Sequence, residues 1–368
     1  MLRFLALFIL IYLNDSYSEE NSSFSLGYQY YYDKNKVIVH EPFFQIKKKI
    51  TRLWFLAFKT SLDITSGASR RLGEDLLGID ATTQASPKGG SGDNEVRKAA
   101  GVNAQYSDQG TVFSGGLDYG KEDDYLSYSI NLSASQDFAQ RNTTLGGGVA
   151  YYKDKFSPTG YFASEGGAKN VSAGYLNLTQ SLTPITLFSL TFNYIQSNGY
   201  LGHPYTPPRD QGGNLITESL PTEKKALALT GEFIQGYLLK ERLGSVNFEY
   251  RRYYDYWGMG SHTIDMKWSQ YITEGTYFRI RGRYYNQSGS DFAKAEYLGN
   301  EKYRTADIRQ FPFYSYMAGV KWDAPLSEAW DNYWFLPDRY SLNYDHTWRN
   351  TKGEEGKTIK FYHLYNED

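Results

Sequence analysis

The chain has 368 residues, no cysteine and a formal net charge of -2, and 17% of its residues are aromatic, including 35 tyrosines. The missing cysteines exclude disulfides and thiolate metal sites, and the near-neutral charge argues against a nucleic-acid partner. Tyrosine joins an apolar ring to a polar hydroxyl, so its abundance suits a protein at a membrane–water interface.

The first residues have the pattern of a secretory signal peptide. A charged start at Arg3 precedes an apolar run over 4–13, and Ser16-Tyr17-Ser18 supplies small residues for cleavage. The apolar run, about ten residues long, is too short to cross a bilayer as a helix. We therefore predict a signal peptide over 1–18 and one mature domain over 19–368, the alternative being a retained, exposed helix.

The mature chain repeats segments in which apolar and polar residues alternate. From Leu126 to Ser135 every even residue is apolar and every odd residue is polar, which gives a strand one apolar and one polar face. Strands of about ten residues with this pattern can cross a bilayer at a tilt. The candidate strands are 23–33, 36–48, 52–64, 96–107, 110–120, 125–138, 142–155, 169–181, 185–197, 224–238, 244–255, 261–271, 276–288, 311–323, 338–349 and 356–365.

The connections between these segments alternate in length. Short turns follow even-numbered segments, whereas the long loops follow odd-numbered ones, at 65–95, 156–168, 198–223 and 289–310. Bacterial barrels combine an even number of strands with short periplasmic turns and long extracellular loops. We therefore predict an all-β fold, a transmembrane antiparallel β-barrel of about 16 strands, surrounded by outer-membrane lipid after secretion to the periplasm.

The last candidate strand resembles the signal that the barrel-assembly machinery recognises in such proteins. A glycine, Gly356, precedes the alternating hydrophobic residues Ile359, Phe361 and Tyr365. Three polar residues after Tyr365 depart from the usual terminal aromatic residue. The barrel-assembly machinery is accordingly an expected partner.

Charged residues fall on one face of three consecutive candidate strands. Arginine or lysine facing lipid at the bilayer midplane costs about 2–4 kcal/mol, so these side chains are expected to line the lumen. The predicted lumenal ladder comprises Glu249, Arg251, Asp265, Lys267, Arg279, Arg281 and Arg283. Such a ladder could attract anions or form one side of a constriction, or it could be a structural lattice of ion pairs that holds the strands in register.

The loop 65–95 is the longest and is the candidate for folding into the bore. Its charged residues would then form a constriction, whereas an outward-facing loop is the alternative. The candidate constriction residues are Arg70, Arg71, Glu74, Asp75 and Asp80. The glycine-rich stretch 89–95 offers carboxylates and carbonyls for calcium but fits no known calcium loop, which favours a linker.

No catalytic or metal-binding pattern emerges from the sequence. The five histidines show no metal-ligand spacing, and no cofactor is expected. Ser261, His262 and Asp265 invite comparison with a catalytic triad, but adjacent residues of a strand point to opposite faces. We therefore predict that the protein is not an enzyme.

Several phrases together resemble an uncharacterised family of bacterial outer-membrane proteins, domain of unknown function 3570. They are Ser66-Gly67-Ala68-Ser69, Ser197-Asn198-Gly199-Tyr200-Leu201, Tyr256-Trp257-Gly258-Met259-Gly260-Ser261-His262-Thr263, Arg283-Tyr284-Tyr285-Asn286-Gln287-Ser288, Asp291-Phe292 and Tyr303-Arg304-Thr305-Ala306-Asp307. The resemblance, over roughly 24–349, implies an outer-membrane barrel without an assigned activity or catalytic residues. It also suggests neighbouring genes for thioredoxin-like proteins, small lipoproteins and flavin-attaching enzymes, and so an envelope redox or electron-transfer assembly.

Two functions follow as expectations. The first is a porin-like outer-membrane channel for small hydrophilic solutes, for which a lumenal arginine ladder is the feature to find. The second is a barrel scaffold or sleeve in an envelope complex that holds a periplasmic or lipoprotein partner. A barrel enzyme would need a Ser/His/Asp set near the external rim, and the sequence offers none.

Overall fold

The computed structural model describes residues 22–33, 38–66, 95–158, 166–202, 207–325, 339–350 and 356–366. Within these ranges the chain forms β-strands and short 3-10 turns such as η1 (Ala139–Arg141) and η3 (Ile308–Gln310). None of the helical segments found there has the length and apolarity needed to cross a membrane. The predicted signal peptide 1–18 and the charged loop residues Arg70, Arg71, Glu74, Asp75 and Asp80 lie outside the described residues.

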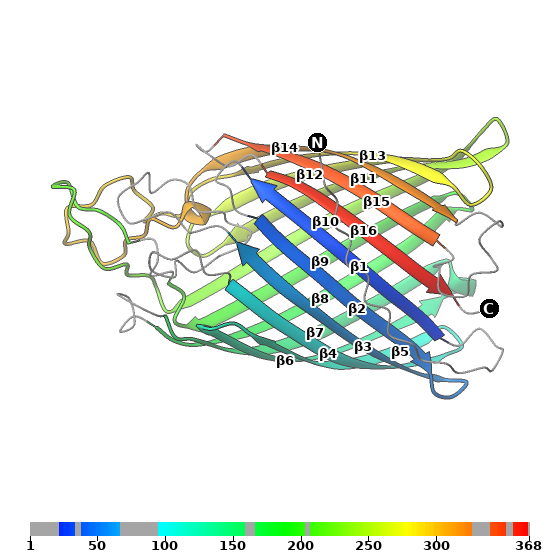
Figure 1. Cartoon of the computed structure of the whole chain (residues 1–368), viewed down its shortest axis with the longest axis horizontal. Helices are drawn as coiled ribbons and strands as arrows, with labels where there is room; N and C mark the ends of the chain where they lie inside the picture. Colours follow the sequence, from blue (N-terminus) through cyan, green and yellow to red (C-terminus); the bar gives the residue numbers. More distant parts are fainter. Residues whose placement is uncertain are drawn as a thin grey trace.

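The described strands form one closed antiparallel barrel (Figure 1). Each strand pairs with its neighbours in the chain, and β1 pairs with β16 from Ser23↔Asn366 to Asp33↔Gly356 to close the ring. The strands are β1 Ser22–Asp33, β2 Ile38–Lys49, β3 Trp54–Ser66, β4 Glu95–Asp108, β5 Thr111–Lys121, β6 Tyr125–Phe138, β7 Thr143–Phe156, β8 Gly167–Thr183, β9 Thr186–Gly199, β10 Glu223–Leu239, β11 Arg242–Asp255, β12 Gly260–Tyr271, β13 Tyr277–Gln287, β14 Phe313–Pro325, β15 Arg339–Arg349 and β16 Gly356–Asn366. The predicted all-β antiparallel barrel is confirmed.

The two faces of the barrel wall follow the alternation of the sequence. On β5 and β6, Leu117 lies opposite Ile130 and both are exposed on the outer face, whereas the next pair, Asp118 and Ser129, lies on the inner face. The same alternation places aromatic and aliphatic side chains on the outside of every strand whose side chains are described. The outer surface is therefore an apolar band of the kind that lipid covers.

The two ends of the barrel differ in their connections. At one end, which we call the short-turn end, two-residue turns such as Gln109-Gly110 and Lys240-Glu241 have positive φ at both residues. Such turns match the twist of antiparallel strands and keep hairpins tight. At the other end, which we call the long-loop end, the β9–β10 and β13–β14 loops project beyond the wall (Figure 1).

The predicted barrel-assembly residues lie on the strand that closes the ring. Gly356, Ile359, Phe361 and Tyr365 are all in β16, where the last three pair with Tyr30, Tyr28 and Phe24 of β1. The backbone register thus places this segment at the barrel seam.

Candidate functional site

The inner face of β11, β12 and β13 carries the charged residues that the sequence analysis selected. The register places Glu249 opposite Asp265, Asp265 opposite Arg283, and Lys267 opposite Arg281. Arg251 lies opposite Thr263, and Arg279 opposite Ser269. All seven residues therefore share one face of three adjacent strands.

Asp265 is the centre of this group. It is buried, with 1% of its side chain exposed. Its carboxylate accepts hydrogen bonds from Arg281 Nε at 3.0 Å and Arg281 Nη2 at 2.5 Å, and from Arg283 Nε at 2.7 Å. One carboxylate thus holds two arginines of the neighbouring strand, and charge-assisted bonds of this kind are stronger than neutral ones.

The third arginine, Arg279, has a different partner. Its Nη2 donates to Asn343 Oδ1 on β15 at 3.2 Å, which means that the side chain crosses β14 on the inner face. The β14 residue between these two in the register is Lys321. The next residue on that face, Gly319, lies between Arg281 and Asp345, and a Cβ atom there would lie 2.0 Å from Asp345 Oδ1. The missing side chain of Gly319 therefore gives Asp345 its place beside the arginines.

The remaining ladder residues form no ion pair with the described residues. Neither Lys267 nor Arg251 has an ionic partner there, and Arg283 keeps 42% of its side chain exposed although it contacts Asp265. Across the inner face of β11–β15 the basic side chains outnumber the acidic ones. The basic residues are Arg251, Lys267, Arg279, Arg281, Arg283, Lys321, Arg339 and Arg349, and the acidic ones are Glu249, Asp255, Asp265, Asp323 and Asp345.

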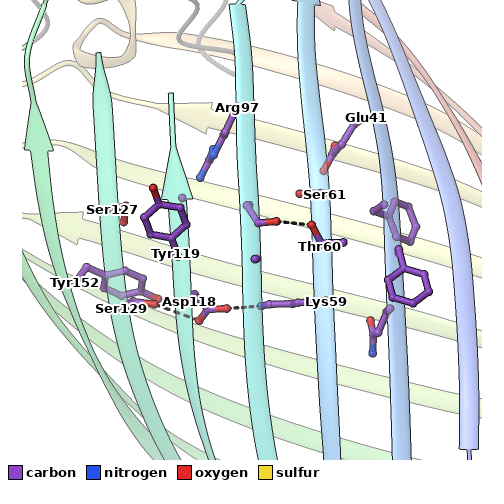
Figure 2. Close-up of a pocket in the computed structure, with 16 residues that line it drawn as sticks. Glu41, Lys59, Thr60, Ser61, Arg97, Asp118, Tyr119, Ser127, Ser129 and Tyr152 are labelled. Carbon is purple, nitrogen blue, oxygen red and sulfur yellow. Dashed lines mark hydrogen bonds and ion pairs between the residues drawn. The ribbon is translucent and has the colours of Figure 1, made fainter. Parts of the chain in front are cut away.

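The opposite wall, β2–β7, carries a second polar group around a cavity of about 460 Å³ (Figure 2). Lys59 Nζ of β3 lies 2.9 Å from Asp118 Oδ1 of β5, and Ser129 Oγ of β6 donates to Asp118 Oδ2 at 3.2 Å. The ion pair passes over Gly101 of β4, where a Cβ atom would lie 2.3 Å from the Asp118 carboxylate. This pair is far more open to water than the Asp265 group, because 66% of the Lys59 side chain is exposed.

Other candidates from the sequence do not converge. Ser261 is buried on the inner side, whereas His262 is exposed on the outer face, where its ring nitrogens lie 2.6 Å from Tyr250 Oη and 2.7 Å from Arg252 Nη1. The triad arrangement of Ser261, His262 and Asp265 is therefore absent. Among the residues described, no three histidine or acidic side chains come together as metal ligands.

The long-loop end carries a feature that the sequence analysis missed: three loops that interlock. We call residues 207–222, 255–259 and 288–312 the cap. Ser219 and Arg304 exchange two backbone hydrogen bonds of 2.8 and 3.0 Å, and Arg304 Nε donates to Thr217 O at 2.6 Å. A second bridge joins Asp210 to Tyr297. The loops therefore behave as one packed unit.

The interior of the cap is polar, and the side chains at its centre are paired with one another and with the backbone. Tyr297 is 1% exposed, and its hydroxyl accepts from Thr305 N at 2.9 Å and lies 2.9 Å from the carbonyl oxygens of Phe292 and Thr305. Thr305 Oγ1 donates to Glu218 Oε1 at 2.5 Å. Because buried polar groups cost free energy unless they are paired, these bonds fix the loops to one another.

The β11–β12 turn joins this unit through Trp257. Its indole Nε1 donates to Glu223 O at 2.9 Å, its ring packs edge-on against Phe292 at 5.3 Å, and Lys224 Nζ lies 4.5 Å above it. Lys224 also forms a 2.8 Å ion pair with Asp255, which is fully buried. The turn is thereby anchored both to β10 and to the β13–β14 loop.

One exposed carboxylate of the cap shows the effect of backbone hydrogen bonds on ionisation. The Leu298 N–H donates to Glu301 at 2.9 Å, and together with a bond from Gly299 N at 3.0 Å it holds the pKa of the Glu301 carboxyl below its usual value. The charged form of Glu301 is therefore the one that the loop conformation favours.

The cap is built largely from the phrases that carried the family resemblance. Tyr256–Met259, Asp291-Phe292 and Tyr303–Asp307 all lie in it. The alternation of apolar and polar residues could not have located the cap, because its loops have no regular spacing of apolar residues. The clustering of tryptophan, glycine and buried polar residues between strands was the available signal.

Comparison with known proteins agrees with this architecture. The profile of a family described as "Protein of unknown function (DUF3570)" matches residues 12–354. No curated protein matches the chain.

Solved structures of outer-membrane proteins have a similar fold. A bacterial polysaccharide outer membrane secretin has 6% identity and a TM-score of 0.51, with 94% of this chain and 98% of that chain covered. CdiB from Acinetobacter baumannii has 8% identity and a TM-score of 0.51, with 94% and 60% covered. OpdK from Pseudomonas aeruginosa has 9% identity and a TM-score of 0.44, with 94% and 98% covered. The two likenesses with a TM-score of 0.51 show that the fold is that of outer-membrane β-barrels.

Proposed function

The chain belongs to the DUF3570 family, and because that description assigns no activity, we propose from the geometry that it is a porin-like channel for small hydrophilic solutes. In this proposal the barrel lies in the bacterial outer membrane, which it reaches after secretion to the periplasm. The apolar outer band and the outer-membrane fold of its structural neighbours support that location.

The observation that carries the proposal is a charged, water-accessible inner wall in a wide barrel. Each strand approaches only its two neighbours in the ring, so the described walls stand apart. Barrels of about sixteen strands leave an aqueous channel unless a segment plugs them. Exposure of Lys59 on one wall and Arg283 on the other is consistent with water between them.

The charge of the inner wall over β11–β15 favours anions. Basic residues outnumber acidic ones on β11–β15, and Arg251 and Lys267 have no ionic partner among the described residues. Charged side chains that line a pore set its selectivity, and arginine or lysine favours anionic solutes. The proposed channel should therefore pass small anions more readily than small cations.

Planar lipid bilayers test the proposal. The refolded wild-type protein should conduct in potassium chloride, and its reversal potential in a salt gradient should show anion preference. Replacing Arg279, Arg281 and Arg283 by glutamine should shift the reversal potential toward cations. Absence of current from a sample with the heat-modifiable migration of a folded barrel would contradict the channel.

A matched control separates the bore from overall charge. Lys98, Lys121 and Lys153 are exposed lysines of the outer face, so their replacement by glutamine removes the same charge without changing the inner wall. This control should keep the wild-type reversal potential. An equal shift in both variants would show that the arginines do not set selectivity.

The cap favours a second candidate function, a scaffold or sleeve that holds a partner in an envelope complex. Its interlocked loops project beyond the barrel and stay packed, which suits a docking platform more than a flexible entrance (Figure 1). A scaffold should retain a partner during purification in mild detergent and lose it when Trp257 is replaced by alanine. A wild-type protein that always purifies alone would contradict this function.

A further inference from the structure

Four lysines occupy one patch of the outer face at the long-loop end, over β4–β7. Lys98 lies directly opposite Lys121, Lys121 opposite Leu126, and Leu126 opposite Lys155, so three of the lysines share one row of the barrel wall. Lys153 lies in the next row, opposite Tyr128. We refer to Lys98, Lys121, Lys153 and Lys155 as the lysine patch.

The lysine patch faces outward rather than into the bore. Lys121 shares its face with Leu117 and Lys153 with Val149, and both of these apolar residues are exposed on the outside. The intervening Asp154 of β7 points inward, where it pairs with Lys169 at 3.2 Å. Strand alternation then leaves Lys153 and Lys155 on the lipid side.

The lysine patch lacks an acidic counterpart. None of its four lysines forms an ion pair or hydrogen bond with the described residues, and all four are exposed. Nearby Glu122 pairs with Arg97 at 3.5 Å, and Asp123 has an interaction of its own. Like charges directly opposite each other destabilise a strand pair. Lys98 and Lys121 form such a pair on β4 and β5. An external anion would remove that repulsion.

The surface beneath the lysine patch restricts what this anion can be. The row that contains Lys153 also pairs Tyr119 with Tyr128, whose rings lie 5.4 Å apart, and the following outer row pairs Leu117 with Ile130. Same-face rows are separated by roughly 7 Å along a strand. The row with three lysines, the row with the tyrosines and Lys153, and the Leu117–Ile130 row therefore follow one another as headgroup, interface and acyl levels do. A ligand filling this surface needs an anionic head and acyl chains.

We propose that the lysine patch binds the phosphate-bearing headgroup of a lipid in the leaflet at the long-loop end. Lysine ammonium groups bind phosphate as point charges, and the tyrosines below contact the upper acyl region. The inference rests on the proposed outer-membrane location but not on conduction. A barrel that carries no current could still hold this lipid.

Native mass spectrometry of the full-length protein in detergent tests the lysine patch with three probes. They are doubly phosphorylated lipid A, the same lipid with its phosphates removed, and inorganic phosphate. The wild-type protein should bind the phosphorylated lipid, bind the dephosphorylated one at least about tenfold more weakly, and show no displacement by millimolar inorganic phosphate. Equal binding of both lipids, or displacement by free phosphate, would overturn the proposal.

A charge-matched pair of variants assigns the binding to this surface. Lys98, Lys121, Lys153 and Lys155 are replaced by glutamine in one variant, and Arg52, Arg141, Lys240 and Arg242 at the short-turn end are replaced by glutamine in the other. The first variant should bind phosphorylated lipid at least about tenfold more weakly, because each lysine near an anionic surface contributes roughly fivefold.

The short-turn variant should bind like the wild type, and equal loss in both would overturn the assignment. Heat-modifiable migration establishes folding of each variant. If the fourfold lysine variant does not fold, the Lys98→Gln, Lys121→Gln double variant serves instead, with an expected partial loss. Wild-type binding by that double variant would also contradict the proposal.

Discussion

Replacing Asp265 by asparagine should destabilise the barrel markedly. The substitution keeps the shape of the side chain but removes the charge that Arg281 and Arg283 share. Removing one partner of a buried ion pair costs about 3–5 kcal/mol. Because Arg283 is 42% exposed and water can solvate it, we expect a loss at or below the lower end of that range, about 2–3 kcal/mol in the free energy of unfolding.

The opposite wall supplies the matched control. Asp118→Asn also removes one carboxylate from an inner-face ion pair, but its partner Lys59 is 66% exposed. Exposed pairs contribute about 0–1 kcal/mol, so this variant should lose little stability. Both substitutions therefore replace a carboxylate by an amide in an inner-face ion pair, and the two ion pairs differ in how deeply they are buried.

Urea unfolding in lipid vesicles, followed by tryptophan fluorescence, measures both variants. The transition midpoint of the Asp265→Asn variant should fall well below that of the Asp118→Asn variant. Equal losses in the two variants, or a loss below about 1 kcal/mol for Asp265→Asn, would refute the reasoning from burial. The same Asp265→Asn variant should increase anion preference in bilayers, since it adds net positive charge to the wall.

Gly319→Ala should lower the free energy of unfolding by about 1 kcal/mol or more, because the new Cβ would displace the Asp345 carboxylate. The control Gly282→Ala has free space on the outer face, so urea unfolding should show it to be neutral or slightly stabilising. Trp257→Ala should loosen the cap without opening the barrel. A protease should then cleave within 288–312 while the heat-modifiable migration of the folded barrel persists. A cap that stays resistant to the protease would contradict the anchoring role of Trp257. The hydrogen bond from Leu298 N–H to the Glu301 carboxylate should persist above the usual carboxyl pKa and be lost as the pH falls through the lowered pKa of Glu301. Hydrogen exchange at Leu298 N–H can follow this loss. Protection that increases on acidification would contradict the predicted direction.

The barrel wall could be predicted because its determinant is local. Alternation alone fixes which residues share a face, so β6 was expected at 125–138 and lies there, and the ladder residues of β11–β13 fall on one face. Alternation does not determine how far a side chain reaches along that face. Arg279 was expected among the ladder carboxylates, yet its hydrogen bond to Asn343 crosses β14 at Lys321.

The cap could not be predicted because its contacts are distant in sequence. No period links Thr217 to Arg304 or Trp257 to Phe292, and each loop taken alone reads as a polar connection. The buried Tyr297 exchanges backbone hydrogen bonds with Arg209 and Gln211 of another loop, and the folded barrel brings these two loops together. The sequence motifs could be recognised, but not the fact that they meet in one cap.

The sequence separation of 87 residues between Thr217 and Arg304 has a kinetic consequence. These two residues can meet only after β10 to β13 have been laid side by side, so the cap must close late in biogenesis. A one-residue slip in those strands would turn every side chain to the wrong face and leave the partners misaligned. The cap contacts therefore form only when these four strands are paired in the correct register.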